Sequence, residues 1–323
     1  MRRARRPISL CLLLVAPLLL SHCASKESNT FGLRMLKPEE SARLSSVYNP
    51  WYTRKTPDRQ DIKLLPPERL ESLGEIALQS QDYEGSLANF VQILEQDPER
   101  DDVRYKVGVI LVLTGHPEAA RKELAQVLAR KPDMLEAHEA LGLVNLEEKQ
   151  YPAAIQEFQT VLARDPKRAK THHLLGLTYL ESGQIPLAIS QLKMAADLNS
   201  TQASTYINLG QAYLRQKDYT QAINSLKKGQ SLAPQNKKVN YFLGMALAGQ
   251  KRYNDALEAF LKAGDEAQAY NNIGVHYFVD GKYEEAAKCF QRAIELRPTY
   301  YGEAKANLQK ALEKLQETQK DAS

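Results

Sequence analysis

Apolar residues recur along most of this chain with the three-to-four-residue spacing of amphipathic helices. From residue 67 onward they form paired stripes, and charged or polar positions flank each stripe. Prolines separate most of the pairs, and a proline cannot continue the interior of a helix. The pattern therefore predicts an all-α chain built from successive helix pairs.

A glycine marks the same place in every predicted pair. These glycines are Gly74, Gly108, Gly142, Gly176, Gly210 and Gly244, each 34 residues after the one before, and Gly274, which follows after 30. If this glycine is called position 8 of a unit, position 20 is small and position 24 is large and apolar in all seven units. Small residues at positions 8 and 20 allow two antiparallel helices to approach closely. One pair cannot bury its apolar face alone, so the pairs are expected to stack.

The 34-residue pattern resembles the tetratricopeptide repeat. LGLTYLESGQIPLAISQLKMA and LGQAYLRQKDYTQAINSLKKG carry the resemblance, which covers seven units over residues 67–300. It implies an all-α solenoid, coiled as a right-handed superhelix, with a capping helix and tail in residues 301–323. The shorter sixth unit predicts that its second helix ends early, near Gly264, because glycine is a good helix stop.

Residues 1–22 have the layout of a secretory signal peptide. The basic head MRRARR precedes a thirteen-residue apolar run, Ile8–Leu20. As a helix they would span roughly 20 Å, less than the roughly 30 Å hydrocarbon core of a bilayer. The alternative is an N-terminal anchor that is not cleaved.

The next segment, LLLSHC, resembles the lipobox of bacterial lipoproteins, although His22 replaces the small residue usual before the cysteine. The resemblance implies that Cys23 is lipidated and that residues 23–66 are a lipid anchor and tether. Ala24 differs from the aspartate of an inner-membrane retention signal, which favours an outer-membrane lipoprotein facing the periplasm. Cleavage nearby, releasing a soluble periplasmic protein, is the alternative.

The leader also accounts for the positive charge of the chain. The whole chain has 43 Lys and Arg against 39 Asp and Glu, and the leader holds four of the basic residues and no acid. The remainder is 39 against 39 (43 minus 4), so no electrostatic argument for nucleic-acid binding remains.

The resemblance places the first helix of each unit on the concave face, where positions 5, 9 and 12 are largely apolar. An apolar groove suits the apolar face of an amphipathic helix or a peptide from a protein partner. The alternative is that these residues only pack neighbouring first helices together. The predicted groove residues are Tyr105, Val109, Val112, Leu143, Leu146, His173, Leu177, Leu180, Ile207, Leu214, Tyr241 and Met245.

No motif for catalysis or for a cofactor stands out in the sequence. His138 and His172 both occupy position 4, where we expect packed, hydrogen-bonded side chains rather than a metal pair. Tetratricopeptide domains that bind the C-terminal carboxylates of chaperones resemble a clamp of Lys at position 5 and Asn at position 9. No unit here has that pair, so we do not expect that function. We therefore expect a binding protein, with no enzymatic activity, metal site or cofactor.

The combination of leader, anchor cysteine and repeats resembles pilotin-type lipoproteins of type IV and tight-adherence pilus systems. That resemblance implies a scaffold that helps a secretin to assemble. The alternatives are an adaptor for a periplasmic protease and a structural scaffold of envelope or cell-wall machinery.

Overall fold

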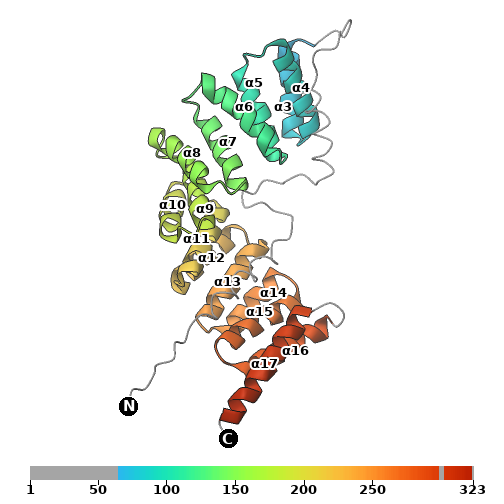
Figure 1. Ribbon diagram of the computed structural model, residues 1–323, viewed down its shortest axis with the longest axis vertical. Helices are drawn as coiled ribbons and strands as arrows, with labels where there is room; N and C mark the ends of the chain where they lie inside the picture. Colours follow the sequence, from blue (N-terminus) through green and yellow to red (C-terminus); the bar gives the residue numbers. More distant parts are fainter. Residues whose placement is uncertain (1–64, 298–301, 322–323) are drawn as a thin grey trace, which may run out of the picture. The chain divides into compact units, whose positions relative to one another are not determined.

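A computed structural model of the protein describes residues 65–297 and 302–321. The described residues form fifteen α-helices and no strand, as the ribbon in Figure 1 shows. The all-α expectation is confirmed. The predicted leader, Cys23 and nearly all of the predicted tether lie outside the described residues.

The helices alternate as first and second members of seven pairs. The first helices are α3 (Pro67–Gln79), α5 (Asp101–Leu113), α7 (Leu135–Glu147), α9 (Ala169–Glu181), α11 (Ala203–Gln216), α13 (Lys237–Gly249) and α15 (Glu266–Val279). The second helices are α4 (Tyr83–Gln96), α6 (Pro117–Arg130), α8 (Tyr151–Arg164), α10 (Ile185–Leu198), α12 (Tyr219–Leu232), α14 (Tyr253–Ala263) and α16 (Tyr283–Leu296). The last helix is α17 (Gly302–Asp321). The chain divides into two compact units: residues 1–130 contain α3–α6, and residues 131–323 contain α7–α17.

Inside every pair the position-8 glycine lies directly against the position-24 side chain. A Cβ added at Gly210 would come within 2.4 Å of Leu226, and the nearest approach is 2.9 Å or less in all seven pairs. The position-20 residues and the position-24 residues are at most 2% exposed in every pair. The two small positions thus let the helices close over one large apolar side chain.

The second helix of the sixth pair is shorter than the others, as predicted. α14 has 11 residues and ends before Gly264, whereas the other second helices have 14. Tyr253 at its start joins it to α15: its hydroxyl donates to the carboxylate of Asp280, and its ring centroid lies 4.2 Å from that of Tyr277. The ammonium of Lys282 lies 4.7 Å from the Tyr253 ring, a cation–π distance.

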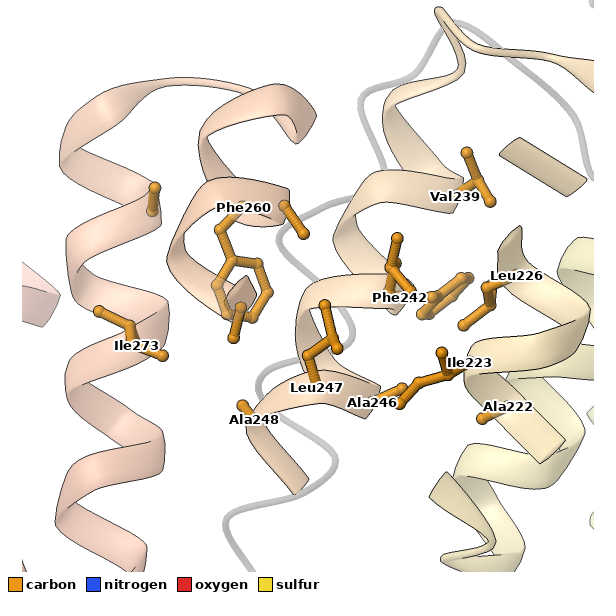
Figure 2. Close-up of a cluster of buried hydrophobic side chains, with 14 of the residues drawn as sticks. Ala222, Ile223, Leu226, Val239, Phe242, Ala246, Leu247, Ala248, Phe260 and Ile273 are labelled. Carbon is orange, nitrogen blue, oxygen red and sulfur yellow. The ribbon is translucent and has the colours of Figure 1, made fainter. Parts of the chain in front are cut away.

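One hydrophobic core extends across α11 to α15 (Figure 2). Ile223 and Leu226 of α12 point toward Phe242 of α13, and Phe260 of α14 lies beside Ile273 of α15. These side chains are at most 6% exposed. Within α11–α15 each pair therefore shares its core with the next pair, as stacking requires.

α17 follows the seven pairs and packs against α16. Ala304 and Ala311 are fully buried in this contact. The side-chain amide of Asn307 donates to Asn271 of α15 at 3.2 Å. Leu312, the residue after Ala311, is 44% exposed.

Candidate partner-binding surface

All twelve predicted groove residues lie on first helices, at position 5, 9 or 12 of their units. Tyr105, Val109 and Val112 belong to α5 in the first compact unit, and the other nine belong to α7–α13 in the second. Six are buried: Val112, Leu146, His173, Leu177, Leu180 and Ile207. Six are half-buried: Tyr105, Val109, Leu143, Leu214, Tyr241 and Met245.

Burial is most complete on α9. Every residue from 171 to 180 is buried, including Leu177 at 1% and Leu180 at 0% exposure. Packing in the interior of the protein therefore explains why Leu177 and Leu180 are apolar. These side chains can hold a surface in place, but little of their own area is available for contact.

The half-buried residues of α11 and α13 retain apolar surface. Leu214, Tyr241 and Met245 all pack against the core that extends across α11 to α15. The ring of Tyr241 lies 5.7 Å from Phe242 and 5.8 Å from Phe260, centroid to centroid. Packing on one side fixes these three side chains while the other side stays open to solvent.

Polar contacts join consecutive first helices, and sequence analysis did not anticipate them. The hydroxyl of Thr171 donates to Glu139, and Nδ1 of His173 lies 2.9 Å from Oγ1 of Thr205. Both contacts run from position 5 of one unit to position 3 of the next. The signal in the sequence is a pair of threonines 34 residues apart.

Burial determines the charge state of His173. This side chain is 3% exposed, and its desolvation lowers its pKa to about 4. The imidazole is therefore neutral near pH 7. The neighbouring carboxylate of Glu139 is instead paired, with the Lys170 ammonium at 3.3 Å.

The two histidines at position 4 are packed and hydrogen-bonded, as predicted. His138 contacts Oε2 of Glu157 at 2.5 Å through Nδ1 and the carbonyl of Pro132 at 3.0 Å through Nε2. The corresponding partners of His172 are Gln191 at 2.7 Å and the carbonyl of Pro166 at 2.9 Å. Each histidine thus links its own second helix to the loop before its first helix.

Arg104 occupies the same position in the first compact unit. Its Nη1 lies 2.7 Å from Oε2 of Glu123, and its Nη2 donates to the carbonyl of Pro98 at 2.8 Å. The side chains of this ion pair are 6% and 0% exposed. In these three units the position-4 side chain therefore has a structural role, because it joins the second helix to the loop before the first helix.

The first pair has glutamates at both position 5 and position 9. Glu71 at position 5 accepts from Lys106 at 2.7 Å and from Arg100 at 2.8 Å. These hydrogen bonds lower the pKa of the Glu71 carboxyl. Glu75 at position 9 also binds Lys106, at 2.8 Å. The predicted groove residues accordingly begin at Tyr105, in the second pair.

Other chemistry is limited in the part of the chain that the structure describes. Within residues 65–297 and 302–321, no three or more His, Cys, Asp or Glu side chains gather as metal ligands would. No helix in these ranges has the length and apolar character needed to cross a bilayer. Cys289 is half-buried, and burial raises the pKa of its thiol to about 11, so it is protonated at neutral pH.

Family models identify the repeats directly. A tetratricopeptide-repeat model matches residues 111–169 and 207–265, and a second model of the same description matches residues 267–300. A model for subunit 3 of the anaphase-promoting complex, or cyclosome, matches residues 147–229. No curated protein matched the chain in a direct comparison.

Several solved structures have the same fold. A tetratricopeptide repeat protein from Parabacteroides merdae is 14% identical with a TM-score of 0.54, over 76% of this chain and 98% of that one. The C-terminal part of a TPR repeat-containing protein from Cytophaga hutchinsonii is 19% identical with a TM-score of 0.56, over 73% and 98%. PilF of Pseudomonas aeruginosa is 23% identical with a TM-score of 0.51, over 66% and 96%.

At these identities the solved structures are evidence of a common fold. The family models, the seven helix pairs and the packing of each position-8 glycine agree with one another. The chain is therefore a solenoid of tetratricopeptide repeats, a protein-interaction scaffold.

Proposed function

We propose that this protein is exported, is lipid-anchored at Cys23, and binds a protein partner as a pilotin-like assembly factor for a pilus or secretion secretin. The observation that carries the proposal is that one chain combines a leader, residues 1–22, with Cys23 directly after it and seven repeat pairs further on. An anchor fixes one end of the chain to a membrane, and the repeats supply the binding surface. Two or more acyl chains would make that attachment stable.

Similarity in fold to PilF supports the pilus part of the proposal. The sequence resemblance to pilotin-type lipoproteins supports the same role independently, because it rests on the leader and on the number of repeats. The proposed location is the outer membrane, facing the periplasm.

We assign contact with the partner to the half-buried first-helix residues Leu143, Leu214, Tyr241 and Met245 of the second compact unit. An amphipathic helix or a peptide can cover such residues with its apolar side. Leu177 and Leu180 are buried and have the role of holding the first helices in position.

Membrane attachment is tested with Cys23→Ser. We expect the parent protein to incorporate labelled palmitate and to sediment with outer membranes, and the variant to do neither. Because Cys23 lies far from the repeats in sequence, the variant should keep the parent's helical circular dichroism. A variant that stays in the membrane fraction would contradict lipid anchoring.

Partner binding is tested by gentle detergent extraction, affinity purification and mass spectrometry. We expect a secretin subunit as the dominant partner, and a loss of about tenfold or more for Leu214→Glu combined with Met245→Glu. Leu261→Glu, at a 40% exposed position on α14, is the matched control and should bind normally. A protease with assorted clients, or cell-wall enzymes, in place of a secretin would overturn the pilotin role.

A further inference from the structure

The first helix of the first pair, α3, exposes an apolar residue that its counterparts bury. Ile76, at position 10 of its unit, is 62% exposed. Position 10 is half-buried at His276 in the last pair. In the five pairs between, it is 0% exposed, at Ile110, Val144, Thr178, Ala212 and Ala246. The structure describes no pair before the first one, so the described residues supply no cover for Ile76.

In later pairs this cover comes from the second helix of the preceding pair. α5, α9, α11, α13 and α15 each contact the second helix that comes just before them in the sequence. A tyrosine at position 17, the first residue of the second helix, packs against the C-terminal half of the next first helix. The ring of Tyr219 fills the space beside Gly249 of α13, and the ring of Tyr253 lies 4.2 Å from that of Tyr277 of α15.

Aromatic residues stand at the matching distance before α3. Tyr83 occupies position 17 of the first unit, and the residue 34 places before it is Asn49. Around Asn49 the sequence reads YNPWY, which contains Tyr48, Trp51 and Tyr52. These residues lie outside the described structure. They have the chemistry and the register of the side chains that cover position 10 elsewhere.

The N-terminal half of α3 needs no apolar cover. Position 3 is at most 1% exposed in all six later pairs, where it is Val, Ala or Thr. In α3 this position is Arg69, which is exposed. The residues that join the YNPWY segment to α3 begin TRKTPDRQDIK and are mostly polar. An aromatic contact at the C-terminal half and a polar link along the N-terminal half would therefore match both halves of the helix.

We propose that residues 48–52 fold back onto α3 and cap the first pair, with Trp51 covering Ile76. The proposal does not depend on lipid anchoring or on the identity of a partner. It leaves residues 24–47 as the link between Cys23 and the folded repeats.

The length of the connecting chain allows this contact. α3 has 13 residues, so it is roughly 20 Å long. Residues 53–64 can span at most about 40 Å. Their far end is held in place, because the side-chain amide of Gln96 on α4 donates to the carbonyl of Leu65 at 3.2 Å. A segment on so short a link has a roughly millimolar effective concentration at α3, which favours it over a second copy or a separate protein.

The fluorescence of Trp51 tests the contact, because the chain has no other tryptophan. In the full chain with Cys23→Ser, we expect Trp51 to emit at a shorter wavelength than in urea. Ile76→Asp places a carboxylate where the ring would have to bury it, so acrylamide quenching should rise about twofold or more. Val279→Asp is the matched control: Val279 is 63% exposed at the end of another first helix, α15, and its substitution should change nothing.

Hydrogen exchange tests the same contact from the other side. Trp51→Ser with Tyr52→Ser should speed amide exchange in α3 by about fivefold or more and leave α15 unchanged. Phe31→Ser, which removes an aromatic residue further from α3 in the sequence, should exchange like the parent.

Three results would overturn the cap. The first is Trp51 emission and quenching that do not respond to Ile76→Asp, and the second is α3 exchange that does not respond to loss of the two aromatic residues. The third is a short-wavelength emission seen only at concentrations where sedimentation shows a dimer, because a second copy would then supply the segment.

Discussion

At the scale of single residues, the position-8 glycine determines how closely two helices of a pair can approach. It works because the facing side chain at position 24 fills the space that a Cβ would need. Even an alanine there would have to displace a buried leucine or phenylalanine. The constraint is one of volume and not of backbone conformation, since these glycines lie inside helices.

Gly210→Ala is expected to lower the free energy of unfolding by about 1–3 kcal/mol, the usual cost of overpacking a core. The added methyl would lie 2.4 Å from Cγ of Leu226. Urea unfolding followed by circular dichroism measures the change. Gly302→Ala, at the start of α17 with nothing within 4 Å, is the control and should be close to neutral. Equal midpoints for the two variants would contradict the close approach.

His173 gives the protein an acid-sensitive contribution to stability. Its folded pKa of about 4 lies below the usual 6.5. Between these values the unfolded state binds more protons, so the free energy of unfolding falls as the pH falls from 6.5 to 4. The full loss is about 3 kcal/mol, reached at pH 4 and below.

His173→Gln should remove this pH dependence while keeping a side chain that can hydrogen-bond Thr205. We would measure thermal unfolding of the parent and the variant at pH 7.5 and pH 4.5. The difference between the two proteins isolates His173, because the other titrating groups are common to both. A variant that loses as much stability in acid as the parent would contradict the burial of a neutral imidazole.

At the scale of helices, α17 covers the last pair. Its buried alanines lie against α16, and Phe290, Phe278 and Tyr277 belong to the same apolar cluster. In stacked repeats each unit contacts only its neighbours, so a terminal helix protects the pair beside it. Leu312, which is exposed, is not part of this protection.

Removing residues 298–323 is expected to speed amide hydrogen exchange in α15 and α16 by about tenfold or more, because their apolar cluster loses its cover. Exchange in α9–α12 should not change. Leu312→Ser serves as the control and should exchange like the parent. Unchanged exchange in α16 after the truncation would show that α17 does not protect it.

At the scale of the whole molecule, the chain has two compact units that meet at Arg130 and Lys131 in the sequence. The boundary falls between the second and third pairs, where the 34-residue spacing continues without change. No feature of the repeat marks this position. The second unit holds five complete pairs and α17.

Residues 131–323 should therefore fold by themselves. We expect the parent's helical signal per residue and cooperative urea unfolding, measured by circular dichroism on a fragment shown to be monodisperse. A matched fragment, residues 151–323, lacks α7, so the apolar face of α8 is exposed to solvent. This fragment should therefore unfold at a lower urea concentration. Equal stability of the two fragments would argue against pairwise packing of α7 and α8.

Residue spacing along the chain is enough to predict the repeat, the pairing of helices and the early end of α14. The pairing depends on residues at fixed spacing, such as Gly210 and Leu226, and the early end of α14 on a missing proline near Gly264. Both features can be read directly from the order of residues along the chain. The leader, the lipidation of Cys23 and the domain limits remain predictions from the sequence, because they fall on residues outside the described structure or on boundaries that it does not test.

How much of each apolar side chain stays exposed depends on three-dimensional packing and could not be predicted from the spacing. Leu177 and Met245 occupy the same position of the repeat, yet the first is buried and the second is half-buried. The contact between His173 and Thr205 and the exposure of Leu187, Met194 and Leu198 on α10 likewise come from the tertiary structure. The physical reason is that burial depends on all neighbours of a side chain, including those 30 or more residues away, whereas periodicity specifies only the face of the helix on which it lies.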